Sequence, residues 1–393
     1  MKKAPRIRFR GFQEDWEQRK LIDLVVRLNK STNSSRLPKL EFEDIVAGEG
    51  RLNKDVSQKF DNRKGIEFLP NDILYGKLRP YLKNWLKATF TGVALGDFWV
   101  FRVKNSDSDF IYSLIQADRY QKAANDTSGT KMPRSDWKKV SGTVFYVPND
   151  LKEQQKIGTL FKQIDDAITL HQRKLDQLKE LKTAYLQVMF VSMKTKNNKV
   201  PKLRFADFGG EWDQRKSKEL FIPKSEKNQP NLPVLSVTQD SGVVYRDQVG
   251  IDIKYDSTTL KNYKVVNKND FVISLRSFQG GFELSDKKGI TSPAYTIFVP
   301  KDIKLHDNLF WKTQFKTFQF IEALKTVTFG IRDGKSISFT EFGDLKLCFP
   351  KNKKEQQKIG KFFEELDYAI SLHQNKLTQL KSLKKSYLQN MFI

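Results

Sequence analysis

The chain has 393 residues, 38% of them hydrophobic, which suits two or three domains with buried cores and excludes a disordered protein. It carries 70 Lys and Arg against 46 Asp and Glu, and the net charge of +24 favours a polyanionic partner such as nucleic acid. No run of 18 apolar residues and no signal-peptide stretch is present, which argues against a membrane protein. The single cysteine, Cys348, excludes an intrachain disulfide, and together these features predict a cytoplasmic location.

A repeated motif opens the chain and recurs in its middle. PRIRFRGFQEDWEQRKLIDL at 5–24 matches PKLRFADFGGEWDQRKSKEL at 201–220 at 9 of 20 positions, with an offset of 196 residues. We call each copy an opening motif. The repeat divides the chain into two equivalent halves, about 1–198 and 199–393.

A long variable stretch follows each opening motif. Residues 25–152 and 221–354 show little identity to one another. Short apolar runs such as DFWVFRV (97–103) and AYTIFV (294–299) alternate with turn signals and predict strands, and FIYSLIQA (110–117) predicts a short helix. Each half therefore contains a mixed α/β domain, and the two domains present different surfaces on one frame.

Loops of the first variable stretch carry the residue types that contact DNA. GKLRPY sets basic and aromatic side chains beside Gly and Pro, and DTSGTKMPR (126–134) combines small hydroxyl residues, Gly and cations, as phosphate contacts do. An ordinary solvated turn is the alternative for any single residue. The candidate DNA-binding residues are Lys77, Arg79, Tyr81, Thr130, Lys131 and Arg134.

The second variable stretch offers similar loops with a different sequence. SLRSFQGGF supplies Arg276 and Gln279, side chains that bind guanine and adenine edges in the major groove. GIRDGKSIS (330–338) matches the place of the earlier hydroxyl-rich loop. The candidates here are Arg276, Ser277, Gln279, Arg332, Lys335 and Ser336.

A second repeat closes each half. From EQQKIG at Glu153 and at Glu355, 25 of 39 positions are identical, with an offset of 202 residues. The segment from Lys152 to Phe190 has no Pro and an apolar heptad, which predicts a coiled-coil helix about 58 Å long. The expected seam and subunit-docking residues are Phe161, Ile164, Ile168, His171, Leu175 and Leu178, and Phe363, Leu366, Ile370, His373, Leu377 and Leu380.

These two helices need partners to bury their apolar stripes. Pairing within the chain predicts an antiparallel coiled coil, and pairing between chains is the alternative. The matched His171 and His373 interrupt one seam. We interpret them as polar residues that set the register of the helices, because no carboxylate or thiol one turn away completes a metal site in both copies.

The sequence contains no catalytic motif that we recognise. GIRDGKS has three residues between its glycines where a phosphate-binding P-loop needs four. Three histidines and one cysteine do not match the spacing of a zinc site or a catalytic triad. The chain is predicted to bind no metal and no cofactor, and to be a binding protein without catalytic activity of its own.

The full set of motifs resembles the specificity subunit of type I restriction-modification systems. The resemblance rests on WEQRKL and WDQRKS, YGKLRPYL, SGTKMPR, ISLRSFQGGF, SPAY and both EQQKIG helices, and it covers nearly the whole chain. It implies an α+β fold in which two target-recognition domains are separated by two long antiparallel helices. The domains expected are 1–150 and 199–350, the first helix with the linker after it is 151–198, and the second helix is 351–393.

The resemblance also implies a mechanism and partners. Each recognition domain reads one half of a bipartite, asymmetric site in double-stranded DNA, and the helices set the spacer between the halves. Two modification subunits with S-adenosylmethionine and two restriction subunits with ATP and Mg dock on the chain. The alternatives are a stand-alone DNA-binding regulator with two reading domains and a purely structural coiled-coil adaptor.

Overall fold

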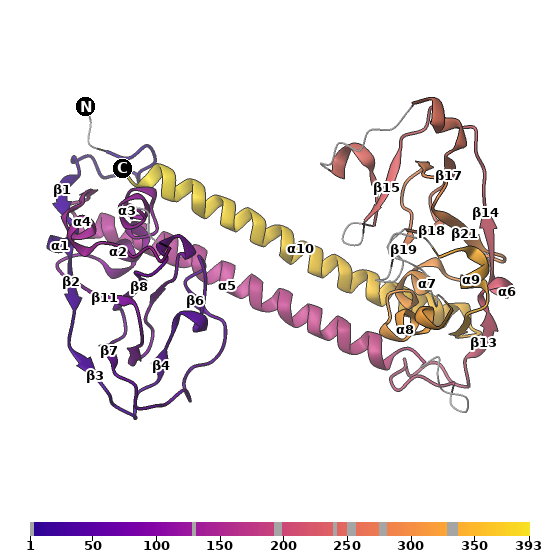
Figure 1. Ribbon diagram of the computed structural model, residues 1–393, viewed down its shortest axis with the longest axis horizontal. Helices are drawn as coiled ribbons and strands as arrows, with labels where there is room; N and C mark the ends of the chain where they lie inside the picture. Colours follow the sequence, from indigo (N-terminus) through magenta and orange to yellow (C-terminus); the bar gives the residue numbers. More distant parts are fainter. Residues whose placement is uncertain are drawn as a thin grey trace. The chain divides into compact units, whose positions relative to one another are not determined.

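The computed structural model describes residues 4–127, 131–191, 199–238, 242–249, 257–274, 281–327 and 337–393. The chain forms two compact units (Figure 1). Unit 1 comprises Met1–Lys174 with His373–Ile393, and unit 2 comprises Leu175–Leu372. The long helices α5 (Leu151–Val188) and α10 (Lys353–Met391) each contribute to both units. No helix within the described ranges is long and apolar enough to span a membrane.

Unit 1 is built on two four-stranded sheets. One has the order β2-β11-β8-β9 and is antiparallel throughout, and the other has the order β3-β7-β10-β4, with β10 and β4 parallel. Its strands are β1 (Glu17–Lys20), β2 (Val25–Leu28), β3 (Ser31–Thr32), β4 (Lys39–Leu40), β5 (Ile45–Val46), β6 (Arg51–Leu52), β7 (Gly65–Phe68), β8 (Ile73–Gly76), β9 (Trp85–Lys87), β10 (Gly92–Ala94), β11 (Phe98–Val103) and β12 (Val144–Val147). Its short helices are α1 (Leu21–Leu24), α2 (Ser108–Leu114), α3 (Asp118–Ala124) and α4 (Trp137–Gly142).

Unit 2 contains an antiparallel sheet of order β14-β21-β18-β19 and further two-stranded sheets. Its strands are β13 (Asp213–Lys216), β14 (Phe221–Lys224), β15 (Leu235–Thr238), β16 (Gly242–Tyr245), β17 (Lys264–Val266), β18 (Phe271–Ile273), β19 (Phe282–Leu284), β20 (Gly289–Thr291), β21 (Thr296–Pro300) and β22 (Lys346–Phe349). Its short helices are α6 (Ser217–Leu220), α7 (Asn308–Gln314), α8 (Phe318–Val327) and α9 (Phe339–Gly343).

The variable stretches share a fold although they share little sequence. In both units a short strand of the opening motif pairs with the strand that precedes the long helix, β1 with β12 and β13 with β22. The main sheets have the same order, with β2, β11, β8 and β9 matching β14, β21, β18 and β19. Two helices follow the central strand in each unit, and α2 and α7 begin 200 residues apart, at Ser108 and Asn308. The structural repeat therefore includes the variable stretches as well as the opening motifs and the long helices.

The core of each unit includes the start of one long helix and the end of the other. In unit 1, Phe161 of α5 and Met391 of α10 are buried with Trp16 and Phe110. In unit 2, Phe363 of α10 and Met189, directly after α5, are buried with Trp212 and Phe310. The core of each unit is thus completed by residues from two distant parts of the chain.

The two long helices follow the sequence prediction closely. We predicted the first from Lys152 to Phe190, and α5 begins at Leu151 and ends at Val188. Side chains cap both helices, since the Lys152 amide donates to Asp150 Oδ1 at 2.8 Å and the Lys354 amide to Asn352 Oδ1 at 2.9 Å.

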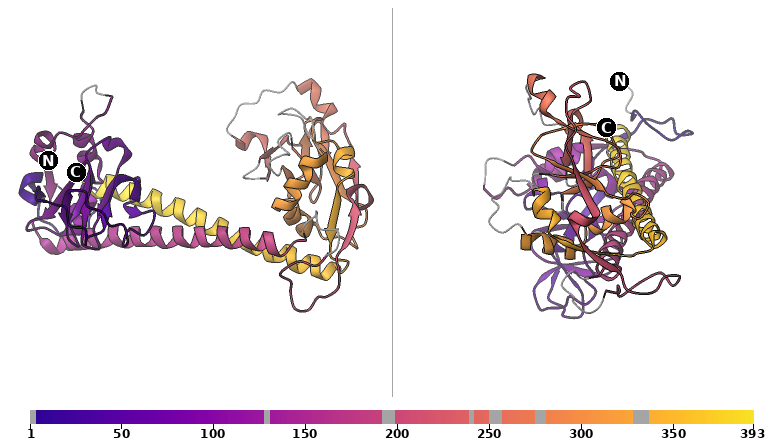
Figure 2. Two further views of the ribbon diagram at one scale, coloured as in Figure 1. Left: turned by 60° about the horizontal axis from the view of Figure 1, so that its bottom comes forward. Right: turned by 90° about the vertical axis from the view of Figure 1, so that its right-hand side faces the viewer.

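The antiparallel pairing of α5 and α10, visible from two sides in Figure 2, is also confirmed. In unit 1, Lys384 Nζ lies 2.6 Å from Asp165 Oδ1. In unit 2, Lys182 Nζ lies 2.5 Å from Asp367 Oδ1. Lys182 and Asp165 recur as Lys384 and Asp367 at the offset of 202, so the two ion pairs are equivalent.

Candidate nucleic-acid interface

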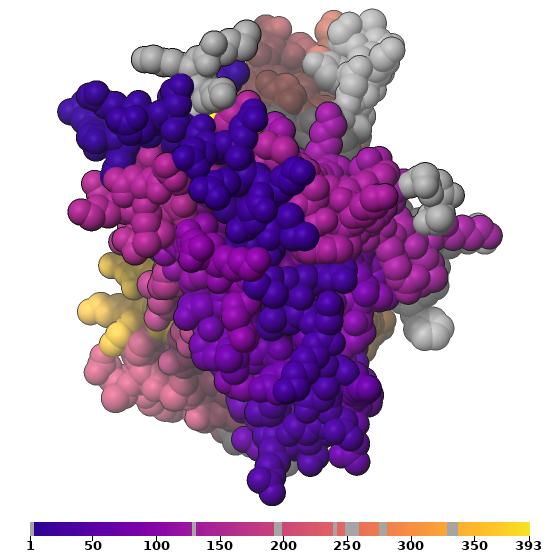
Figure 3. All heavy atoms as spheres, turned by 90° about the vertical axis from the view of Figure 1, so that its left-hand side faces the viewer, coloured from indigo at the N-terminus to yellow at the C-terminus, as the bar shows by residue number. Residues whose placement is uncertain are grey.

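The repeated motifs form a clamp at the start of each long helix. In unit 1, the guanidinium of Arg8 donates to both carboxylate oxygens of Glu153, at 2.6 and 2.8 Å, and Trp16 Nε1 donates to the same carboxylate at 3.4 Å. Glu153 is buried, and its hydrogen bond with Arg8 raises the pKa of the arginine. In Figure 3 the early residues of unit 1, in indigo, lie against its later part, in purple and magenta. The clamp attaches the opening motif to α5.

The next residues of EQQKIG attach the variable domain to the same helix. Gln154 Oε1 accepts a hydrogen bond from the Asp107 amide at 3.0 Å, and Asp107 Oδ1 caps α2 by accepting from the Phe110 amide at 2.8 Å. A Cβ atom on Gly158 would lie 2.4 Å from Asp107 Oδ1 and 2.6 Å from the Phe110 nitrogen. Only glycine leaves room for this close approach of α5 to α2.

Unit 2 repeats the clamp contact for contact. Arg204 donates to Glu355 at 2.7 and 2.8 Å, and Trp212 Nε1 donates to it at 3.2 Å. Gln356 Oε1 accepts from the Asp307 amide at 2.9 Å, and a Cβ on Gly360 would lie 2.7 Å from the Phe310 nitrogen. The clamp residues shared by the two halves therefore hold each unit together.

The structure brings the two predicted loops of unit 1 side by side. GKLRPY follows β8, and the Arg79 amide donates to the Pro133 carbonyl at 2.7 Å. The Ser135 amide donates to the Lys77 carbonyl at 2.8 Å, and Leu78 and Arg134 form an antiparallel bridge. Residues 82–125 separate these loops in the chain, so the sequence did not predict that they form one surface.

Asp97 orders two of the predicted cations at the base of this surface. Arg134 Nη2 lies 3.0 Å and Lys77 Nζ 3.5 Å from the Asp97 carboxylate. Burial by itself would raise the pKa of Asp97, but the hydrogen bond from Arg134 and the charges of Arg134 and Lys77 outweigh it and lower the pKa. Asp97 is therefore ionised at neutral pH and fixes the directions of both cations.

The other predicted residues of unit 1 are exposed around this base. Arg79 and Lys131 are exposed, and 56% of the Tyr81 surface is accessible. Arg79 and Lys83 have left-handed backbones, with φ of 49° and 59°, a strained conformation for residues other than glycine and one that is frequent at functional sites. Thr130 lies outside the described residues.

The predicted DNA-binding residues of unit 2 lie outside the described ranges: Arg276, Ser277, Gln279, Arg332, Lys335 and Ser336. Their flanking residues are described. Ser274 and Gly281 are joined by a backbone hydrogen bond of 2.9 Å, Ile273 pairs with Thr296, and Thr296 Oγ1 donates to the Ile337 carbonyl at 3.1 Å. Both flanks of the first segment and the residue after the second therefore lie next to β18 and β21, the equivalents of β8 and β11.

The predicted seam residues of the long helices are all buried or half-buried. Phe161, Ile164, Ile168, Leu175, Phe363, Leu366 and Leu377 are buried, and His171, Leu178, Ile370, His373 and Leu380 are half-buried. Their role in docking other subunits stays a prediction.

His171 and His373 face each other, with 2.9 Å between their Nδ1 atoms. One nitrogen must carry a proton and the other must not, so the pair is a directional contact that favours one register. Burial, followed by His171 and Lys174, lowers the pKa of His373. Across the described ranges, no group of three or more His, Cys, Asp or Glu side chains is arranged to hold a metal ion.

Sequence reasoning missed Asp97 and the clamp residues as structural determinants. The clamp residues had a signal, because Arg8, Trp16 and Glu153 are identical to their counterparts in the second half. No such signal in the sequence pointed to Asp97, because a single aspartate before a strand is common in any chain.

A family model described as the type I restriction modification DNA specificity domain matches the chain twice, over residues 13–180 and 210–382. The chain belongs to that family. The two matches divide the specificity protein into the same halves as its internal repeat, and each includes one variable domain and most of the helix that follows. No curated protein matches the chain by sequence.

One solved structure of a specificity subunit shares the fold of this family member. The S subunit of a type I restriction-modification system from M. genitalium has a TM-score of 0.67 at 15% identity, and the similarity covers 99% of each chain. The HsdS subunit from Thermoanaerobacter tengcongensis is also 15% identical, with a TM-score of 0.42 and coverage of 99% of this chain and 98% of that one. The specificity fold predicted from the sequence is therefore confirmed.

Proposed function

We propose that this chain is the DNA-specificity subunit of a type I restriction-modification complex. Each of its two units reads one half of a bipartite, asymmetric site in double-stranded DNA. The observation that carries the proposal is the double family match, because one chain with two specificity domains has two reading surfaces. Their loops differ in sequence, which supports two unlike half-sites.

The reading surface of unit 1 is the pair of loops held by Asp97. The fixed cations Lys77 and Arg134 suit phosphate contacts, which set the position of a protein on the duplex. The exposed Arg79 suits a guanine edge, and Tyr81 adds an amphipathic ring beside it. Lys131 is exposed and completes the proposed surface among the described residues, and Thr130 remains a candidate from the sequence alone.

The reading surface of unit 2 is proposed by equivalence. Arg276, Ser277 and Gln279 follow β18 as Lys77 and Arg79 follow β8. Arg332, Lys335 and Ser336 precede α9, and their flanking residue Ile337 bonds to the strand next to β18. Different side chains after equivalent strands would lead to different base sequences.

The long helices act as the spacer and carry the partner subunits. A helix of 38 residues is about 57 Å long, the length of roughly 17 base pairs, which suits a spacer between two half-sites. Two modification subunits supply S-adenosylmethionine and methylate adenine, and two restriction subunits supply the ATP- and Mg-dependent activity. The chain itself supplies sequence specificity and no catalytic group.

Co-expression with the neighbouring modification subunit tests the proposal. The host genome is then sequenced for N6-methyladenine, with a strain that lacks this chain as the control. One bipartite motif with a constant gap, absent from the control, is the expected result. A soluble complex that leaves the genome unmethylated contradicts the proposal and favours a stand-alone regulator that binds its site without partners.

The spacer role has its own test. Removing one heptad from both helices should change the length of the gap and leave both half-sites unchanged, because the reading loops lie outside the helices. Altered half-sites with an unaltered gap contradict the spacer role.

A further inference from the structure

The strands β5 and β6 of unit 1 are joined by a short turn, residues 47–50, which we call the hairpin turn. Gly48 and Gly50 have left-handed backbones, with φ of 73° and 67°, and Glu49 lies between them. A Cβ atom on Gly50 would lie 1.9 Å from Tyr112 Oη, so only glycine lets the turn pack this closely against α2. The packing of the turn therefore fixes the place from which Glu49 projects.

The hairpin turn also holds the end of the loop that carries Arg79. The Gly48 amide donates to the Lys83 carbonyl at 2.9 Å, and Lys83 ends the short 3-10 helix Pro80–Leu82 that follows Arg79. Arg79 and Lys83 both have left-handed backbones, and residues in such a strained conformation keep it only where their surroundings hold them. The hairpin turn supplies one of the contacts that keep this loop in place.

Glu49 joins the hairpin turn to the long helix α10. Glu49 Oε1 lies 2.7 Å from Lys381 Nζ, and Glu49 Oε2 accepts a hydrogen bond from Arg51 Nε at 2.7 Å. Burial by itself would raise the pKa of Glu49, but the hydrogen bonds from Lys381 and Arg51 outweigh it and lower the pKa. Glu49 is therefore ionised at neutral pH and forms a charged contact between residues 332 positions apart in the chain.

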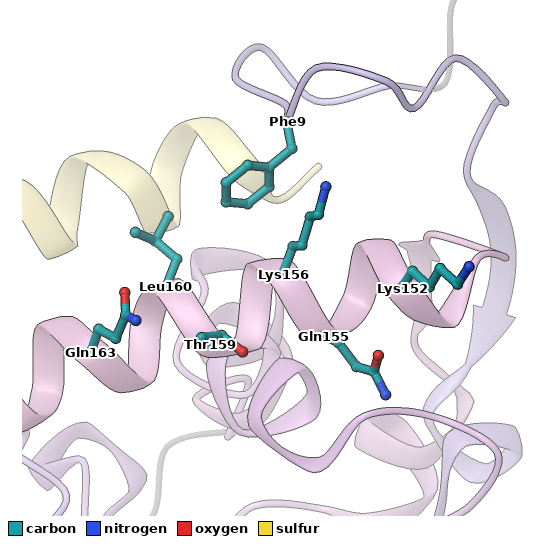
Figure 4. Close-up of a pocket in the computed structure, with 7 residues that line it drawn as sticks. All are labelled: Phe9, Lys152, Gln155, Lys156, Thr159, Leu160 and Gln163. Atoms are coloured by element: carbon teal, nitrogen blue, oxygen red, sulfur yellow. The ribbon is translucent and has the colours of Figure 1, made fainter.

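The end of α10 is a firm support for this contact within unit 1. Figure 4 shows the end of α10, in pale yellow, beside the first turns of α5 and next to Phe9 and Leu160, which pack against the same buried core. Lys384, one turn beyond Lys381, donates to Gln116 Oε1, just after α2, at 2.6 Å. The last turns of α10 therefore contact both the hairpin turn and the helix on which that turn packs.

We infer that Glu49 is a positioning residue for the reading surface of unit 1. Its ion pair with Lys381 ties the hairpin turn to α10, and the turn holds the Arg79 loop in the orientation that fits its half-site. The inference rests on the proposed function, because it concerns how unit 1 reads DNA. Glu49 acts through the loop and not by contact with DNA, so the reading of one half-site depends on the last turns of the chain.

The DNA preference of the assembled complex tests the inference. The full chain with its modification subunit is bound to duplexes that carry the methylated motif, or that motif altered in one half-site, at fixed salt. The ratio of the two affinities is the preference for that half-site. E49Q should lower one preference roughly 2- to 5-fold, and K381E, which adds repulsion, roughly 3- to 10-fold. The half-site affected should be the one that Arg79→Ala weakens, and the other preference should stay unchanged.

Three further variants separate the ion pair from a general effect of charge. K385E makes the same charge change at an exposed lysine one turn further along α10 and should keep both wild-type preferences. K381R keeps the positive charge and should restore the preference that K381E loses. E49Q/K381E should lose no more than E49Q alone, because the neutral amide no longer repels the added carboxylate. Losses in the double variant that are the sum of both single losses contradict the pairing and overturn the inference.

Hydrogen exchange of the full chain without DNA gives a second measurement. Amides of residues 76–85 should exchange roughly 2- to 10-fold faster in E49Q and K381E than in the wild type or K385E, and those of residues 213–224 in unit 2 should be unchanged. Unchanged exchange in the Arg79 loop, unchanged preferences, or equal losses at both half-sites overturn the inference and leave the proposed function standing. A wild-type complex without preference for either half-site overturns both.

Discussion

The clamps of the two units are nearly identical, whereas the loops proposed to read DNA differ in sequence. Arg8 meets Glu153 at 2.6 Å in unit 1, and Arg204 meets Glu355 at 2.7 Å in unit 2. The strands beside the clamps keep the same order but fill their interiors differently. Unit 1 packs Trp, Tyr and Phe rings together, and unit 2 uses mainly phenylalanines.

This difference shows which residues specify the fold that the two units share. Contacts that join distant segments, such as the opening motif and the long helix, tolerate little change because a buried charge needs its partner. Core rings change more readily when volume and pattern are kept. The loops beyond the strands are the least constrained by folding, so they are free to differ in what they bind.

The largest expected effect comes from breaking either clamp. Glu153→Ala and Glu355→Ala each leave a half-buried arginine and a buried indole without their acceptor, and each should cost its own unit about 3–5 kcal/mol. Hydrogen exchange measured separately in the two units checks this. Glu153→Gln should lose less stability than Glu153→Ala. Equal loss of protection in both units from one substitution would show that the clamps are not local.

Filling the close approach beside the clamp should have a smaller effect. Gly158→Ala and Gly360→Ala place a Cβ within 3 Å of the first turn of α2 or α7, and each should cost about 1–3 kcal/mol by chemical denaturation. Gly142→Ala and Gly209→Ala are matched controls, because a Cβ there meets no atom within 4 Å. Destabilisation by the controls as large as by the clamp variants would contradict the packing explanation.

Changes in the reading loops should affect DNA and not folding. Arg79→Ala should weaken binding to one half-site, and Arg276→Ala to the other, by about 1–3 kcal/mol each, with unchanged unfolding. Binding of the assembled complex to duplexes altered in one half-site at a time measures both. Lys138→Ala, at an exposed lysine of α4, is the control. Uniform weakening over all duplexes would assign the arginines to phosphate contacts.

The smallest expected effect concerns the histidine pair. The pKa of His373 lies below its usual value in the folded chain, so the stability from the neutral pair is complete above about pH 6.5 and is lost as the pH falls. Between pH 7.5 and 5.5 the wild type should lose roughly 1–2 °C more in Tm than H171Q/H373Q. Burial raises the pKa of Asp165, so this carboxyl makes the fold more stable as the pH falls. Asp165 is present in the wild type and in the variant, and its contribution therefore cancels in the comparison. A steeper fall in the variant contradicts this role.

The sequence by itself determined the repeat, the long helices and the fold class. Helix periodicity is a local property, so α5 was predicted to within two residues at each end. The opening motif and EQQKIG were recognisable because they occur twice, although their mutual contact through Arg8 and Glu153 was not predicted. Two loops of unit 1 were identified by composition as candidates for contact with DNA.

The tertiary structure alone decided which distant segments meet. It placed Met391 in the core of unit 1 and Met189 in the core of unit 2, and it joined the loops of Arg79 and Arg134 around Asp97. It also gave two dissimilar stretches the same strand order. Such contacts depend on chain closure over tens or hundreds of residues, and no local pattern of hydrophobicity or charge encodes them.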